Sequence, residues 1–284
     1  MFKDIIREKL REYSPKNGIE QENILQEIVQ YYMLASLART GFFSIAGFHG
    51  GTYLRMVHNL DRFSEDLDFI LKKPDRKFKW QEYTGPVLGD LQAEGLKLQI
   101  QDRSESNVKK VFLKTDSIGK VILIDLPFSR HNARKIRVKL EIDTNPPKGS
   151  EFETQYINFP TVAAITTQSP DSSFSLKSHA LLCRKYVKGR DWYDFAWYVS
   201  KKTRLNFILL KNALLQIGPW EKQKLSIDMD WYVKNLKEKI TGIDWKKAKE
   251  DVMRFIPTAS QDKLEVWSRD FFINQLEQMK RYMD

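Results

Sequence analysis

Two aspartates that alternate along an apolar stretch are the residues of this chain best suited to chemistry. Asp66 and Asp68 belong to the stretch DLDFIL, which has the composition of a β-strand. Side chains alternate along a strand, so both carboxylates share one face, while Leu67 and Phe69 point to the core. Two close carboxylates repel each other unless a cation lies between them. Oxygen ligands with no histidine or cysteine to help favour Mg²⁺ or Mn²⁺.

A glycine turn precedes the aspartates by the length of one short helix. It consists of Gly50, Gly51 and Thr52, and a helical segment follows. Glycine lets the backbone approach a ligand closely. If Thr52 opens the helix, the N–H groups there favour a phosphate. The two motifs together predict a site for a metal ion and a nucleoside triphosphate, whereas the aspartates alone would favour the solvated face of an edge strand.

A third carboxylate is expected from a neighbouring strand, and the stretch IRVKLEIDTN supplies it. One face of this strand is apolar and the other carries Lys139, Glu141 and Asp143. Glu141 is the first choice for the metal site and Asp143 the second. The alternative is an ordinary polar strand face.

Cations and carboxylates also gather in the helical stretch LKSHALLCRKYVKGRDWYDF. Lys177 could hold a triphosphate as a point charge. Asp191 and Asp194 are three residues apart and share a helix face, so Asp194 could orient the lysine or a substrate group. The alternative here is a surface helix with ordinary salt bridges.

The hydrophobic pattern predicts an α+β (α/β) chain. Residues 1–40 have helical periodicity, and the stretches 96–103, 108–115, 119–127 and 134–145 are strand candidates. We expect a helix after residue 79 that is interrupted near Gly85-Pro86, and a strand that enters the glycine turn from Phe42. The prediction is a mixed sheet flanked by helices in residues 1–160 and a helical domain in residues 161–284 that contributes to the cleft.

Composition limits the class of protein. The net charge is +10 and the pI about 9.4, which favours an anionic partner such as nucleic acid, nucleotide or an acidic membrane surface over ordinary solubility charge. The single cysteine excludes an internal disulfide and fits a reducing cytosol. No apolar run approaches the roughly 18 residues of a membrane span, so we expect a cytoplasmic protein that has no membrane as a partner. The basic clusters expected near the site are Lys72, Lys73, Arg76, Lys77 and Lys79, then Arg130, Arg134, Lys135 and Arg137.

These motifs together resemble the AbiEii/AbiGii toxin family of the nucleotidyltransferase superfamily. The shared pattern is a Gly-Gly-Thr turn, DRFSEDLDF, KLEID, a helical lysine and RDWYD, in that order over about residues 45–195. The resemblance implies a nucleotidyltransferase fold and a toxin of a toxin–antitoxin or phage-defence system. It implies transfer of nucleotides from a nucleoside triphosphate to an RNA acceptor such as tRNA, with Mg²⁺ or Mn²⁺, and a cognate antitoxin as partner.

The resemblance also assigns roles to individual residues. Asp66, Asp68 and, less firmly, Glu141 would bind metal, Lys177 would contact the triphosphate, and Asp194 would complete the site. Gly50, Gly51 and Thr52 would contact phosphates, and Arg62 and Ser64 match family positions with a structural or phosphate-contacting role.

Three other functions stay open at the level of sequence. The chain could transfer a nucleotide to a protein or small molecule, it could move a single phosphate as a kinase does, or it could bind nucleic acid or an antitoxin through a vestigial site. The last is disfavoured because each expected acidic position is filled.

Overall fold

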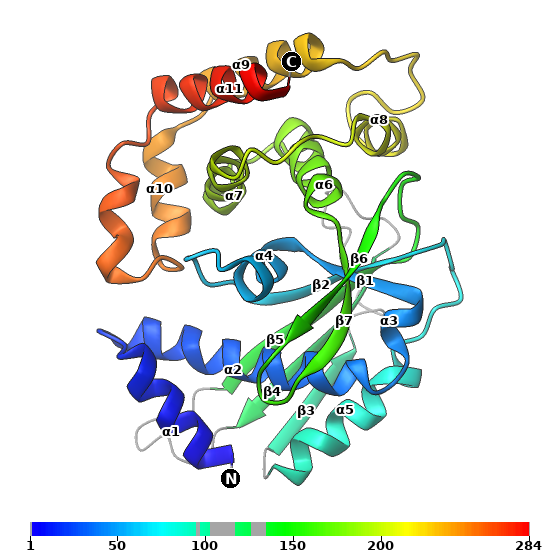
Figure 1. Ribbon diagram of the computed structural model, residues 1–284, viewed down its shortest axis with the longest axis vertical. Helices are drawn as coiled ribbons and strands as arrows, with labels where there is room; N and C mark the ends of the chain where they lie inside the picture. Colours follow the sequence, from blue (N-terminus) through cyan, green and yellow to red (C-terminus); the bar gives the residue numbers. More distant parts are fainter. Residues whose placement is uncertain (1, 95–96, 103–116, 126–134, 284) are drawn as a thin grey trace. The chain divides into compact units, whose positions relative to one another are not determined.

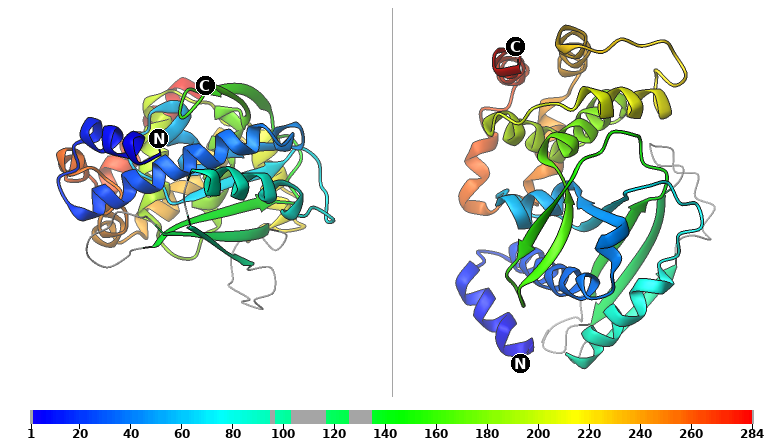
Figure 2. Two further views of the ribbon diagram at one scale, coloured as in Figure 1. Left: turned by 90° about the horizontal axis from the view of Figure 1, so that it is seen from below. Right: turned by 45° about the vertical axis from the view of Figure 1, so that its right-hand side comes forward.

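A computed structural model describes residues 2–94, 97–102, 117–125 and 135–283, and they form two compact units (Figures 1 and 2). The first unit contains the described residues of 2–102 and 117–125, with 135–146 and 152–167; the second contains 147–151 and 168–283. The first unit extends to residue 167 because its last strand joins the sheet. The domain boundary expected at residue 160 stays a prediction.

Seven strands form one mixed sheet in the part of the chain that the structure describes. They are β1 (Ala46–His49), β2 (Asp66–Leu71), β3 (Lys97–Asp102), β4 (Ser117–Asp125), β5 (Lys135–Asp143), β6 (Phe152–Ile157) and β7 (Ala163–Gln168). Their order is β3-β4-β5-β2-β1-β7-β6. β2 pairs with β5 in parallel and with β1 in antiparallel fashion. The aspartate strand is therefore an interior strand of the sheet, and the predicted mixed sheet flanked by helices is confirmed.

Five helices accompany this sheet among the described residues of the first unit, and most of them contact its strands. They are α1 (Phe2–Tyr13), α2 (Gly18–Ala38), α3 (Phe42–Ile45), α4 (Gly50–His58) and α5 (Gln81–Ala93). Asn17 caps α2 by accepting a hydrogen bond from the Glu20 N–H at 2.9 Å. α2 and α5 lie side by side and α4 packs against β2 (Figure 1). In the left view of Figure 2, α2 and α5 lie above strands of the sheet.

Two local predictions were wrong and one cannot be compared. Phe42–Ile45 is a helical turn, so the strand begins only at Ala46. α5 continues through Gly85 and Pro86, because both residues are exposed and water can reach the carbonyl group that the proline leaves without an N–H donor. The strand expected at 108–115 lies outside the described residues.

An aromatic core holds β2 against the helices. Phe69 is fully buried, with its ring centroid 4.9 Å from that of Phe42 and 5.9 Å from that of Trp80. Leu67 is also fully buried, and on β5 the same is true of Leu140. The alternation read from DLDFIL therefore holds for Leu67 and Phe69, which pack inside, and for Asp66 and Asp68, which occupy the other face.

The second unit consists of helices in its described residues. They are α6 (Pro170–Cys183), α7 (Gly189–Ser200), α8 (Phe207–Gln216), α9 (Met229–Thr241), α10 (Trp245–Met253), the 3₁₀ helix η1 (Thr258–Leu264) and α11 (Arg269–Met283). Trp192 of α7, Trp245 of α10 and Phe272 of α11 form its aromatic centre, with the Trp245 and Phe272 rings stacked 4.2 Å apart. None of the helices described in either unit is both long and apolar enough to cross a membrane.

Candidate active site

The two aspartates lie beside Glu141 on the neighbouring strand. In the parallel pairing of β2 with β5, Asp66 is opposite Lys139 and Asp68 is opposite Glu141. Paired residues point to the same face of a sheet, and neighbouring strands are about 4.8 Å apart. The structure therefore brings the three predicted carboxylates onto one face. Lys139 forms an ion pair with Glu141 on that face.

Asp143 is less well placed than Glu141. It is paired with Ile70 at the far end of β2. Its carboxylate accepts a hydrogen bond from the Asn145 N–H at 3.0 Å, so it serves the turn that follows β5. Of the two candidates for a third carboxylate, only Glu141 lies directly opposite Asp68.

The glycine turn meets Asp68 directly. β1 ends at His49, which is opposite Asp68, and α4 begins at the next residue. Gly50 has φ +84°, and a Cβ atom there would lie 2.5 Å from Oδ2 of Asp68. Only glycine adopts such a backbone readily and leaves room for the carboxylate. The helix thus opens at Gly50 rather than at Thr52, with its first N–H groups at the aspartate strand.

Gly51 and Thr52 contact the segment that leads into β2. A Cβ atom on Gly51 would lie 2.5 Å from Nη2 of Arg62 and 2.9 Å from Oγ of Ser64. The Thr52 hydroxyl donates a hydrogen bond to the Asp66 carbonyl group. Arg62 is 2% exposed and donates from Nη1 to the Phe63 carbonyl group at 3.0 Å. In these contacts the side chains of Arg62 and Thr52 support the backbone around Asp66.

The electrostatics of this face suit a divalent cation. Burial, together with the neighbouring Asp68 carboxylate, raises the pKa of Asp66 to about 6, although Lys139 acts in the opposite direction. Burial and the repulsion from Asp68 both disfavour the ionised form of Asp66, and a cation bound at this face would favour it. Within the described residues there is no ready-made group of three or more His, Cys, Asp or Glu ligands. The donor set fits a hard ion that takes part of its shell from substrate oxygens.

Lys177 forms a buried ion cluster in the second unit. Its Nζ lies 2.7 Å from Oδ1 of Asp191 and 2.8 Å from Oδ2 of Asp194. Nε of Arg184 lies 3.3 Å from Oδ2 of Asp191. Lys177 is 15% exposed and Asp194 is fully buried. The structure therefore joins Lys177 with Asp194. Asp191 was not among the predicted site residues, although its spacing from Asp194 was the signal that could have included it.

The charges of this cluster do not cancel. Burial alone would raise the pKa of Asp191, but Lys177, Arg184 and Lys188 hold it well below its usual range. Burial, with the neighbouring Arg190, Arg184 and Lys177 cations, lowers the pKa of Lys188. Three cations, Lys177, Arg184 and Lys188, therefore act on Asp191, whereas the lowered pKa of Lys188 reflects its burial first. An environment with this many cations is suitable for an anion.

The basic clusters differ in their distance from the aspartates. The cations of the first cluster are all exposed and lie between β2 and α5: Lys72, Lys73, Arg76, Lys77 and Lys79. They follow the far end of β2, so at about 3.3 Å per residue they begin roughly 13 Å from Asp68 and roughly 20 Å from Asp66 along the strand, and their nearness to the site stays a prediction. Arg137 lies on β5 on the same face as Glu141. Arg130 and Arg134 lie outside the described residues, as does the side chain of Lys135.

Comparison with known proteins decides the family. The model of the family described as nucleotidyl transferase AbiEii toxin, type IV TA system, matches residues 32–273. The chain belongs to the AbiEii family. The predicted resemblance is thus confirmed, and the chain is a nucleotidyltransferase toxin of a type IV toxin–antitoxin family. No curated protein sequence matches it at a significant level.

Two solved structures resemble this chain along most of its length. The crystal structure of JHP933 from Helicobacter pylori matches with a TM-score of 0.50 at 18% identity, covering 93% of this chain and 92% of that one. A second H. pylori crystal structure has a TM-score of 0.49 at 18% identity and covers 93% of this chain and 95% of its own. At this identity the first match supports the fold alone.

Proposed function

We propose that this AbiEii-family chain transfers a nucleotide from a nucleoside triphosphate to an RNA acceptor such as tRNA, with Mg²⁺ or Mn²⁺. The observation that carries the proposal is the meeting of three elements. β2 presents Asp66 and Asp68, β5 presents Glu141 opposite Asp68, and α4 begins with Gly50 against the same carboxylate. Phosphoryl transfer needs charge compensation and positioning more than covalent catalysis, and these elements can supply both.

Each part of the site has a role in this proposal. Asp66 and Asp68, with Glu141, would hold a divalent ion, and such an ion would supply neutralisation of charge on the triphosphate. The N–H groups at the start of α4 lack partners within the helix and hold phosphate oxygens. Glu141 accepts the proton as the acceptor hydroxyl attacks the α-phosphorus and pyrophosphate leaves. Arg62 and Ser64 support the aspartate segment from behind Gly51.

The roles of Lys177 and Asp194 stay part of the proposal. Lys177 provides a cation for the triphosphate, and Asp194 orients it through the 2.8 Å ion pair. Asp191 belongs with them because it shares the same lysine. The excess positive charge of this cluster supports an anionic ligand.

The distribution of charge favours a long acceptor. Arg137 lies on the carboxylate face, and the exposed basic cluster after β2 begins roughly 20 Å from Asp66. A single nucleotide cannot reach both, but an RNA backbone can. A cytoplasmic location and a cognate antitoxin complete the proposal, the second because the family is of the toxin–antitoxin type.

Labelled triphosphates test this function. The purified chain is incubated with Mg²⁺, total RNA and each triphosphate, labelled at either the α- or the γ-phosphate. Label from the α-phosphate in RNA is the expected result, and Asp68→Asn should abolish it while the exposed Asp270→Asn should not. Label from the γ-phosphate alone would mean phosphate transfer, label in protein would mean a protein acceptor, and no label in any product would overturn the proposal.

A further inference from the structure

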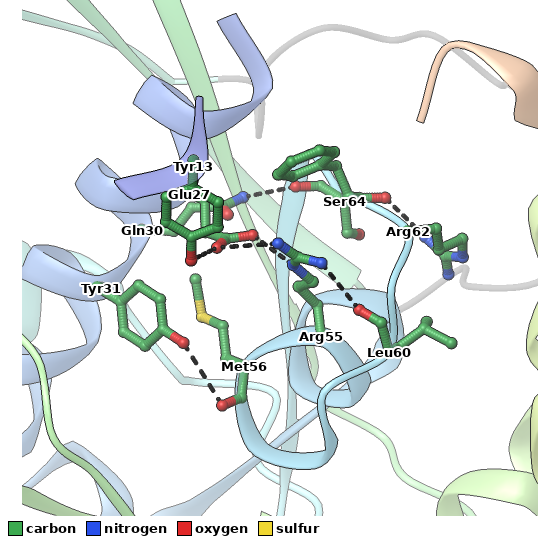
Figure 3. A network of polar contacts seen from close by, with 10 residues as sticks. Tyr13, Glu27, Gln30, Tyr31, Arg55, Met56, Leu60, Arg62 and Ser64 are labelled. Carbon is green, nitrogen blue, oxygen red and sulfur yellow. Dashed lines mark hydrogen bonds and ion pairs between the residues drawn. The ribbon is translucent and has the colours of Figure 1, made fainter. Parts of the chain in front are cut away.

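Side chains, rather than the sheet alone, hold the backbone that leads to Asp66. Four consecutive carbonyl groups, those of residues 63–66, each accept a hydrogen bond from a side chain. The donors are Arg62 to Phe63 at 3.0 Å, Gln30 to Ser64 at 3.1 Å, Gln26 to Glu65 at 2.7 Å, and Thr52 to Asp66. Two of the four donors, Gln26 and Gln30, come from α2. Figure 3 shows Gln30 reaching Ser64 and Arg62 next to it.

Gln26 connects two strands at once. Its side-chain amide donates to the Glu65 carbonyl group before β2 and to the Arg137 carbonyl group of β5, at 2.7 Å and 3.1 Å. A glutamine amide carries two N–H donors, so both are used. The next row of the sheet is the pair of Asp66 with Lys139. Gln26 therefore fixes the separation of β2 from β5 just before the carboxylates begin.

An ion pair fixes the helix that carries these glutamines. Glu27 of α2 accepts from Nε of Arg55 on α4 at 2.6 Å, and Arg55 also donates to the Leu60 carbonyl group at 3.1 Å. The hydroxyl of Tyr13 donates to Glu27 at 2.9 Å. Figure 3 shows Arg55 between Glu27 and Leu60, with Tyr13 above Glu27. The ion pair thus connects α2 both to α4 and to the segment that enters β2.

The burial of Gln26 and Gln30 calls for a physical explanation. Gln26 is 9% exposed and Gln30 is 1% exposed, among the buried apolar residues of α2. A polar group buried in this way is costly unless it is hydrogen-bonded, and an apolar side chain would pack there without that cost. The hydrogen bonds of the two glutamines explain their burial, because they hold the backbone that precedes the carboxylates on β2 and on β5.

We propose that Gln26 and Gln30 are positioning residues of nucleotide transfer, which set the spacing of Asp66 and Asp68 from Glu141. The inference rests on the proposed function, since it assigns a purpose to that spacing. Neither glutamine touches the reacting atoms. They act by holding the carbonyl groups of residues 64 and 65 and that of Arg137.

Gln26→Leu tests the proposal, with Gln21→Leu as matched control because Gln21 is exposed on the same helix. Misplacement of reacting groups by about 1 Å can cost about 100-fold in rate. We expect Gln26→Leu to lower kcat by about 10- to 100-fold and to raise the Mg²⁺ concentration for half-maximal rate, with the KM for nucleotide changed less than about threefold. Gln21→Leu should match the wild type.

Two measurements apart from activity separate positioning from stability. Mn²⁺ binding, followed by electron paramagnetic resonance with a non-reactive nucleotide analogue, should weaken in Gln26→Leu. Hydrogen exchange should increase in β2 while helices of the second unit stay protected. If Gln26→Leu does not fold, Gln26→Asn replaces it, because the shorter amide cannot reach both carbonyl groups.

These measurements test the positioning role of Gln26 and the proposed function independently of each other. A folded Gln26 variant with the kcat and Mn²⁺ affinity of Gln21→Leu would overturn the positioning role. An absence of nucleotide transfer by the wild type would overturn the proposed function instead, and the comparison of Mn²⁺ binding would still test the role of Gln26.

Discussion

The Cα atom of Gly50 faces the carboxylate of Asp68 so closely that a methyl group on it would lie 2.5 Å from Oδ2. The backbone at Gly50 also has φ +84°. Gly50→Ala should therefore both strain the turn, at about 1–3 kcal/mol of stability, and displace the carboxylate. We expect a loss of nucleotide transfer of about 100-fold or more.

Gly89→Ala is the control for this substitution. Gly89 lies in α5, and a Cβ atom there would meet nothing within 4 Å. Alanine should stabilise the helix by about 0.5–1 kcal/mol and leave the rate unchanged. Thermal unfolding and transfer rate are measured for both variants, and equal activity of Gly50→Ala and Gly89→Ala would contradict the close-approach argument.

Asp66→Asn should make folding less sensitive to pH in the presence of EDTA. Because the pKa of Asp66 is raised to about 6 in the folded protein, the group contributes stability below its unfolded value near 4 and loses it as the pH rises through about 6. At pH 7.5 the variant should therefore be more stable than the wild type, by on the order of 1–3 kcal/mol. Transfer should nevertheless be abolished.

Urea unfolding at pH 5 and at pH 7.5 checks the sign. The advantage of Asp66→Asn should grow between the two values, whereas Asp270→Asn, at an exposed position of α11, should give the same small difference at both. A constant difference for Asp66→Asn would show that the carboxylate has an ordinary pKa.

Lys177→Met should affect both stability and activity, and a second substitution separates them. Loss of the lysine leaves Asp191 and Asp194 buried without their shared cation, at a cost of about 3–5 kcal/mol. Adding Asp194→Asn removes one of the two charges and should recover part of the stability. If Lys177 stabilises charge in the transition state, the double variant should still lose about 100-fold or more in rate. If the double variant recovers activity together with stability, the cluster of Lys177, Asp191 and Asp194 has a structural role and no catalytic one.

Reversing charge in the basic cluster after β2 should weaken binding of long RNA. Lys73 and Lys77 are exposed there, so Lys73→Glu with Lys77→Glu should leave folding unchanged. The KM for tRNA should rise, and the slope of log affinity against log salt should fall by about one for each lost phosphate contact. With a three-nucleotide RNA as acceptor, the double variant should transfer nucleotide at the same rate as the wild type. Lys234→Glu with Lys237→Glu, on the exposed part of α9, is the matched control. If this pair raises the KM for tRNA equally, the basic cluster after β2 has no specific part in binding RNA.

The sequence was informative where chemistry depends on local alternation. The shared face of Asp66 and Asp68 follows from strand geometry, and the same argument placed Glu141 and Asp143 together on one face of β5 without deciding between them. Helical spacing likewise placed Asp191 and Asp194 on one face of α7, but it could not show that Lys177 of α6 lies beside them. Such patterns are local, and a single element is enough to reveal them.

The supporting residues could not be predicted in this way. Gln26 and Gln30 interrupt the apolar pattern of α2, and nothing in that helix identifies carbonyl groups in β2 and β5 as their partners. α5 was misjudged because Pro86 usually ends a helix, whereas its exposure here makes the lost hydrogen bond tolerable. β6 was missed because FETQYI alternates too weakly for a strand whose side chains are mostly not buried.

The hydrogen bond from Gln26 to Arg137 joins residues 111 positions apart in the chain. During synthesis the amino-terminal part emerges first, and distant strands must close a long loop before they can pair. A nascent chain that ends before β5 carries both aspartates but has neither Glu141 nor the strand that supports them. On the proposed mechanism, a fragment of this toxin released before β5 is made would therefore be inactive. An active enzyme would form only late in translation.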